Sequence, residues 1–131
     1  MTTVASGLWT SPALPLKKPT EEEADFSGQR ITWFIRELRN TVVYGEIWER
    51  PQLSKRDRSL ITVAVLQAMY RTSELRTHIG RALDQNGVTP QEVSEVILHV
   101  TFYAGWPAAV NAGRLAAEAF EERGVELSEL E

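Results

Sequence analysis

Three residues whose types and spacing could support chemistry lie together in the middle of the chain: Arg71, Glu74 and His78. Glu74 and His78 are four residues apart, so on a helix they share one face and their side chains can hydrogen-bond. A carboxylate that orients an imidazole fixes its tautomer and raises its basicity, which suits proton transfer near neutral pH. Arg71 is close enough to hold an anionic group or to pair with the carboxylate. The alternative is a solvated helical face with an ordinary ion pair.

Other polar and aromatic residues are candidates for the wall of a substrate pocket, with packing or a surface position as the alternative for each of them. Those in the first half of the chain fall in a predicted loop, where binding residues are often found. The two histidines lack the short spacing typical of a metal site, so the sequence predicts no bound metal. These wall candidates are Tyr44, Glu46, Trp48, His99 and Trp106.

The composition indicates a single soluble domain of 131 residues. The net charge of −4 argues against nucleic-acid binding, because no basic stripe is available for phosphates. With no cysteine, the chain has neither disulfides nor thiol chemistry. The uncharged stretch from Val96 to Gly113 approaches the length of a membrane span, but Gly105-Trp106-Pro107 interrupts it. With no secretory signal at the N-terminus, we expect a cytoplasmic protein without a membrane segment.

The element that must position Arg71, Glu74 and His78 is a helix predicted from about Ser54 to Tyr70. From Leu60 to Met69 it has almost nothing polar on any side, and such a helix must be covered on every side. One small domain has few elements for this, so part of the cover is expected from another subunit. The polar residues after Tyr70 would then lie at the rim or floor of an enclosed pocket.

The remaining periodicity predicts an all-α fold, a compact bundle of about five to six helices completed by oligomerisation. A first amphipathic helix follows Ser27 and should stop near Gly45. Thr89-Pro90-Gln91-Glu92 is a strong helix start. The predicted organisation is an extended or partly disordered arm over residues 1–28, a helical domain over 29–124 and a tail over 125–131. The arm could also lie over a neighbouring subunit, anchored by Trp9, Leu14 and Leu16.

Several motifs in order give the chain from Tyr44 to Phe120 a resemblance to the carboxymuconolactone decarboxylase family. They are the glycine-x-x-tryptophan-x-arginine-proline run of Gly45–Pro51, the arginine-serine-leucine start of a helix at Arg58, the glutamate-leucine-x-x-histidine turn of Glu74–His78, NGVTPQEVSEV and YAGWPAA. The resemblance implies an all-helical homo-oligomer, often a trimer or hexamer. One branch of the family is a thiol peroxidase with a CxxC pair; here Arg71 and Glu74 stand at the matching positions, which excludes that chemistry.

The resemblance further implies loss of carbon dioxide from 4-carboxymuconolactone in aromatic catabolism (the β-ketoadipate pathway), with no cofactor. On that reading His78 is the proton donor or oxyanion partner, Glu74 orients it, and Arg71 clamps the carboxylate of a small anionic lactone or carboxylic acid. Two alternatives remain. One is a related cofactor-free lyase or isomerase acting on another carbonyl compound in specialised metabolism, and the other is a non-catalytic oligomeric binding protein.

Overall fold

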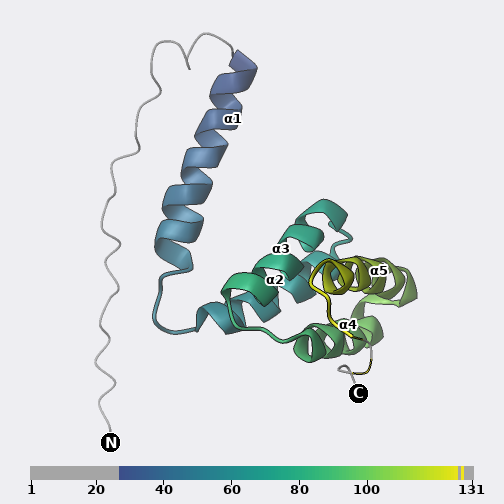
Figure 1. The fold of residues 1–131 in the computed structure, drawn as a ribbon. Helices are drawn as coiled ribbons and strands as arrows, with labels where there is room; N and C mark the ends of the chain where they lie inside the picture. Colours follow the sequence, from purple (N-terminus) through teal and green to yellow (C-terminus); the bar gives the residue numbers. More distant parts are fainter. Residues whose placement is uncertain (1–26, 127, 129–131) are drawn as a thin grey trace, which may run out of the picture. The chain divides into compact units, whose positions relative to one another are not determined.

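A computed structural model describes residues 27–126 and 128 of the chain, and within them every regular element is helical, as predicted. The contacts divide the chain into two units, Met1–Arg50 and Pro51–Glu131, and each is described by itself. The proposed anchors Trp9, Leu14 and Leu16 lie outside the described residues, and the predicted boundaries of arm, domain and tail stay predictions. The elements are α1 (Ser27–Leu38), the π-helical η1 (Arg39–Ile47), α2 (Lys55–Ala68), α3 (Thr72–Gln85), α4 (Pro90–Ala104) and α5 (Trp106–Glu122) (Figure 1).

In the first unit, α1 runs directly into η1, so the helical segment passes Gly45, where the sequence predicts its end, and stops at Ile47. A π-helix this long is unusual, because such turns mostly occur singly. Tyr44 and Glu46 therefore lie in the last helical turn and not in a loop. The rings of Tyr44 and Trp48 are 5.9 Å apart, which the spacing of four residues along the helix explains.

The second unit packs α2 to α5 around a core of aliphatic side chains and alanines, with Phe120 as its one buried aromatic residue among those described. Helix α2 begins as predicted, since the Ser54 hydroxyl accepts a hydrogen bond from the Asp57 amide at 3.0 Å. Helix α4 begins with the predicted capping box between Thr89 and Glu92. Small side chains on α5 allow a close approach to α4. The core contains Val63, Leu75, Ile79, Ala82, Val88, Val93, Ile97, Ala112, Leu115, Ala116, Ala119 and Phe120.

Helix α2 has one buried and one exposed face, and the buried face includes two polar residues. Ser59, Val63 and Gln67 form the buried face, whereas Ile61 and Val65 on the other side are about half exposed, at 51% and 47%. The second unit by itself therefore covers only part of this helix. Whether another subunit covers the exposed face of α2, as the sequence predicts, stays a prediction.

At the corner between α2 and α3, helix α3 begins at Thr72, and its N-cap residue is Arg71, which makes no side-chain cap. Helix α2 ends in a Schellman motif, in which the Tyr70 amide donates to the Gln67 carbonyl at 3.1 Å and the Arg71 amide to the Leu66 carbonyl at 2.9 Å. These two bonds close the turn within three residues, so Thr72 is already helical.

Candidate active site

The predicted catalytic residues lie on the first two turns of α3. Arg71 and Glu74 are exposed, at the N-cap and in the first turn, and His78 is half-buried one turn further along. The negative charge of Glu74 is favourable there, because the N-terminus of a helix carries a partial positive charge. The spacing of four residues keeps Glu74 and His78 on one face, but whether they act together stays a prediction.

The electrostatic surroundings of His78 differ from those expected. Burial lowers the pKa of His78, and the positive charge of Arg81, three residues later on the same helix, lowers it further. The sequence led us to expect a more basic imidazole because of Glu74, and the shift has the opposite direction. Burial and Arg81 therefore both favour the neutral form of the His78 imidazole in the free protein.

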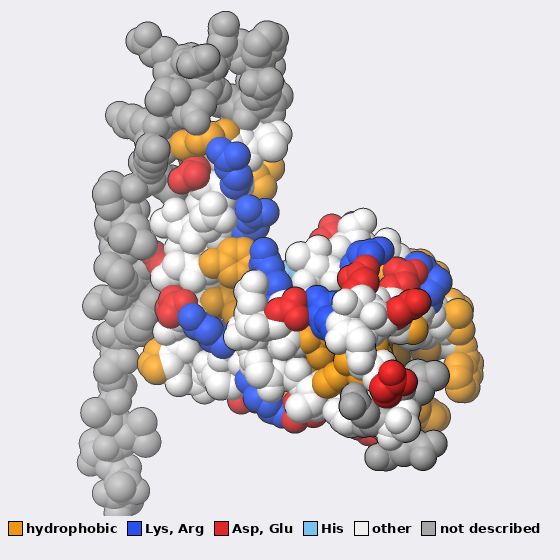
Figure 2. All heavy atoms as spheres, viewed as in Figure 1, with side chains coloured by type: hydrophobic (Ala, Val, Ile, Leu, Met, Phe, Trp, Pro, Cys, Tyr) orange, Lys and Arg blue, Asp and Glu red, His pale blue; other side chains and the backbone are white. Residues whose placement is uncertain are grey.

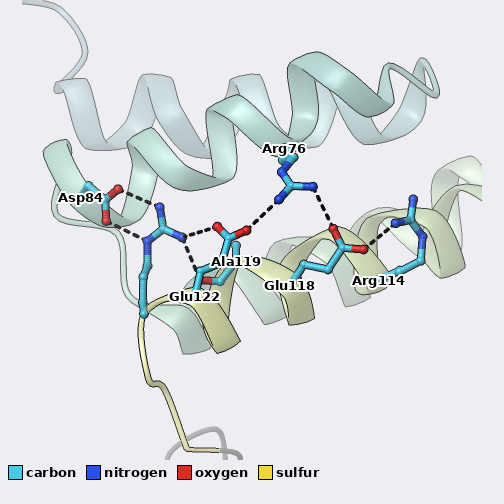
Figure 3. A network of polar contacts seen from close by, with 7 residues as sticks. Arg76, Asp84, Arg114, Glu118, Ala119 and Glu122 are labelled. Carbon is cyan, nitrogen blue, oxygen red and sulfur yellow. Dashed lines mark hydrogen bonds and ion pairs between the residues drawn. The ribbon is translucent and has the colours of Figure 1, made fainter.

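A ladder of alternating charges joins α3 to α5 and fixes how the two helices lie against each other (Figure 3). Glu118 accepts from both Arg76 and Arg114, at 3.1 and 2.6 Å, and Arg76 also pairs with Glu122 at 2.7 Å. Figure 2 shows red and blue side chains interspersed over these two helices. Exposed pairs of this kind add little stability each, but together they hold the helix that carries His78 in register. The ladder consists of Arg76, Asp84, Arg114, Glu118, Glu122 and Arg123.

Two further predicted site residues lie near the junction of α4 and α5. His99 is exposed near the end of α4, where its ring lies 5.1 Å from that of Tyr103. Trp106 is the first residue of α5 and is 71% exposed. Whether His99 and Trp106 share a site with His78 stays a prediction.

Tyr44, Glu46 and Trp48 belong to the first unit, and their place in a site with His78 stays a prediction. No group of three or more metal-ligating side chains in the described part of the chain could hold a metal ion. None of its helices is long and apolar enough to cross a membrane.

A cavity of about 600 Å³ opens beside Trp106, between the α2–α3 corner and the start of α5. Sequence reasoning missed most of its lining. Asn111 did give a signal, as a polar residue in the uncharged stretch from Val96 to Gly113, but nothing in the sequence connected it to Tyr70, 41 positions earlier by the numbering. The lining residues are Tyr70, Trp106, Pro107, Val110, Asn111 and Arg114.

Comparison with known proteins agrees with this helical arrangement. The model of the carboxymuconolactone decarboxylase family matches residues 34–119. The chain belongs to this family. It is 41% identical over 108 residues to a 4-carboxymuconolactone decarboxylase of Acinetobacter baylyi, with 80% of each chain covered. It is also 35% identical over 77 residues to the nitrosuccinic acid decarboxylase npaB of Metarhizium robertsii, covering 59% of this chain and 53% of that protein.

The family match includes α2 to α5 up to Ala119 and begins within α1, so it takes in all eight predicted site residues. It also takes in Tyr70, Asn111 and Arg114, which line the cavity. Both the His78 region and the cavity beside Trp106 therefore lie within the part of the chain that matches the carboxymuconolactone decarboxylase family. The two regions differ in that His78 does not line the cavity beside Trp106.

Proposed function

We propose that this protein is a cofactor-free carboxy-lyase acting on a small unsaturated acid, with 4-carboxymuconolactone as the first candidate substrate. The observation that supports this best is the 41% identity, over 80% of both chains, to a protein named for that activity. The second relative is also named as a decarboxylase, of a different acid. Loss of carbon dioxide is what the two names share.

The chemistry needs an acceptor for two electrons, and the substrate can supply it. In 4-carboxymuconolactone the leaving carboxylate is conjugated, through the ring double bond, to the lactone carbonyl. When its C–C bond breaks, carbon dioxide leaves and the electron pair moves onto the carbonyl oxygen, giving a dienolate. A proton then adds to the α-carbon. Nitrosuccinic acid has a nitro group beside a carboxyl group, which can accept the electron pair in the same way.

The protein's task is to stabilise the dienolate oxygen and to supply the proton. We assign the proton to His78, with Glu74 as its positioning residue and Arg71 as the clamp for the substrate carboxylate. An anion bound beside the imidazole favours the protonated form and so offsets the influence of Arg81 on its pKa. The imidazolium donates to the α-carbon, and solvent restores the proton.

The test is ultraviolet-monitored turnover of 4-carboxymuconolactone by His78→Gln and by Thr77→Ala as its control. Thr77 is an exposed neighbour on α3 whose hydroxyl bonds only to the carbonyl of Ser73 among the described residues. We expect His78→Gln to lose about 10²–10⁴-fold in kcat, the usual contribution of a positioned proton donor, and Thr77→Ala to keep its rate. Full turnover by folded His78→Gln would overturn the assignment.

A pH profile adds a second readout. Because Arg81 lowers the pKa of His78, Arg81→Gln should raise it and move the His78 limb of kcat/KM to higher pH. A profile that does not move would mean that a different group titrates.

A second candidate substrate class is supported by the nitrosuccinic acid decarboxylase. The same assay should therefore include nitrosuccinic acid and a panel of unsaturated lactones. Turnover of nitrosuccinic acid alone would favour the reading as a related lyase of specialised metabolism. No turnover of any of them would favour the reading as a non-catalytic binding protein.

We also propose that the protein acts as a homo-oligomer, a trimer or hexamer. The support is the amount of apolar surface that one protomer leaves exposed, since monomeric proteins rarely expose large contiguous apolar patches. Native mass spectrometry tests this, and a single species at 14.8 kDa would contradict it. The large apolar side chains that the second unit exposes outside the cavity beside Trp106 are Leu53, Ile61, Val65, Met69, Leu98, Phe102 and Tyr103.

A further inference from the structure

The cavity beside Trp106 is built from two parts of the second unit. The α2–α3 corner contributes Tyr70, and α5 contributes residues of its first turns along one side of the helix. Pro107, Asn111 and Arg114 follow each other at intervals of four and three residues, which places them on one helical face. The cavity does not include His78, so it is a different place from the proposed catalytic residues.

Asn111 is the first sign that this cavity takes a ligand. Its side chain is 8% exposed, and its amide nitrogen has no hydrogen-bond partner among the described residues. Buried polar groups are nearly always hydrogen-bonded, because an unpaired one has lost its water without compensation. As placed, this nitrogen is itself buried. A half-turn of the amide about its last bond exchanges nitrogen and oxygen and turns the donor to the accessible side, where it can meet a molecule in the cavity.

Tyr70 lines the same cavity from the α2–α3 corner. Its φ of 58° is positive, which makes it the one residue other than glycine in the left-handed region within the described chain. Its side chain is 55% exposed, so burial of the ring does not offset the backbone strain. Retaining a tyrosine where glycine would relax the turn is understandable if the ring is needed in the cavity that it lines.

The charge around the cavity favours an anion. Helix α5 has no side-chain cap at its N-terminus and no acidic residue in its first turn, so the positive end of its dipole is not neutralised there. Arg114 adds a full positive charge, with Glu118 at 2.6 Å as its partner. Trp106 and Val110, each 71% exposed, provide flat and apolar walls.

We propose that this cavity is a binding site for a small organic carboxylate with a flat, unsaturated body. The carboxylate accepts a hydrogen bond from the Asn111 amide and faces the charge of Arg114, while the body of the ligand lies against the rings of Trp106 and Tyr70. The site does not depend on the decarboxylase activity proposed above. Its natural occupant is either a substrate or product of the enzyme or a separate effector with the same chemistry.

The experiment titrates benzoate into the full-length protein and follows the indole N–H of Trp106 and the side-chain amide of Asn111 by proton–nitrogen NMR. Benzoate should produce saturable shifts at both groups, and benzamide, which is the same shape without the charge, should not. Asn111→Leu keeps the size of the side chain and removes its polar atoms, so we expect it to stay folded and to bind benzoate about tenfold or more weakly.

The arginines offer a matched pair of variants. Arg114→Gln and Arg76→Gln each remove a partner of Glu118, but only Arg114 lines the cavity. Binding should weaken in Arg114→Gln and stay at the wild-type level in Arg76→Gln. Wild-type affinity in both Asn111→Leu and Arg114→Gln would overturn the proposal, as would the absence of saturable binding.

The last part of the experiment distinguishes binding in this cavity from binding at His78. Benzoate binding should persist in His78→Gln, and binding that disappears there but survives in Asn111→Leu would place the anion at His78 and overturn the cavity site. If the decarboxylase proposal fails, the titration still stands, because it needs no turnover. Where turnover exists, competitive inhibition by benzoate identifies a substrate subsite, and a change in kcat alone identifies an effector site.

Discussion

Helices α2 and α5 end in the same way and with different residues. In each, the last carbonyls are satisfied by the pair of bonds of a Schellman motif: Tyr70 and Arg71 donate at the end of α2, and Gly124 and Val125 donate at the end of α5. The residue in the left-handed conformation is Gly124 with φ of 67° in α5 and Tyr70 with φ of 58° in α2. Glycine adopts this conformation without a steric penalty, and tyrosine does not.

The side-chain contacts at the two helix ends also differ. At the end of α5, Arg123 holds both carboxylate oxygens of Asp84, at 2.7 and 2.8 Å, and donates to the Ala119 carbonyl at 2.7 Å. At the end of α2, the side chain of Tyr70 is exposed beside the cavity and makes no hydrogen bond to a described residue. The end of α5 is therefore supported by side-chain hydrogen bonds, while the end of α2 combines backbone strain with an exposed side chain.

The largest expected effect on stability comes from placing a tyrosine at position 124, where glycine adopts the left-handed conformation without strain. Gly124→Tyr should lower the free energy of unfolding by about 1–2 kcal/mol, the penalty for a side chain in the left-handed conformation. No atom lies within 4 Å of a Cβ built on Gly124, so Gly124→Ala should lose about as much. Urea unfolding at unchanged m-value measures both. If Gly124→Ala left the free energy of unfolding unchanged, the turn would tolerate a side chain. The comparison with Gly124 would then say nothing about strain at Tyr70.

The reverse exchange should have a smaller effect of opposite sign. Tyr70→Gly removes the strain but makes the unfolded chain more flexible, so we expect a net gain of about 0.5 kcal/mol in the free energy of unfolding. Tyr70→Phe is the control, because it keeps both the ring and the strain and should leave stability unchanged. Stability that falls in Tyr70→Gly would show that packing of the ring, and not function, explains the tyrosine. Benzoate binding should weaken in Tyr70→Gly and persist in Tyr70→Phe.

The sequence predicted those parts of the fold that local signals determine. Thr89, Pro90 and Glu92 lie within four residues of one another, so the capping box of α4 could be identified without knowing the fold. The end of α3 before Gly87 was predictable for the same reason. The end of the central helix near Tyr70 was also predicted, but the left-handed conformation of Tyr70 was not, since a left-handed tyrosine leaves none of the glycine signal by which such turns are identified.

The candidate site was harder to predict because its electrostatics depend on packing. The spacing of Glu74 and His78 suggested a raised basicity for the imidazole, but burial by other helices together with Arg81 determines the direction of the pKa shift. Likewise, Arg76 pairs with Glu118 and Glu122 more than forty positions away, and the cavity joins Tyr70 to Asn111. Contacts this distant in sequence follow from the fold and not from any local pattern.

The last test concerns the ion pair that distinguishes the end of α5. The hydrogen bonds from Arg123, followed by its positive charge, hold the pKa of Asp84 below its usual value. A carboxyl group whose pKa is lowered by folding stabilises the protein above its unfolded pKa, and this contribution is lost as the pH falls through the lower, folded value. Asp84→Asn should therefore lower stability at neutral pH and lose less stability than the wild type on acidification.

The effect should be small because the pair is exposed to solvent. Thermal unfolding between neutral and acidic pH measures it, with Glu95→Gln, an exposed carboxylate of α4 outside the charge ladder, as the control. Equal acid sensitivity in Asp84→Asn and wild type would show that the Arg123–Asp84 pair does not support the end of α5. The contrast with α2 would then rest on Gly124 alone, and backbone strain would be the whole difference between the two helix ends.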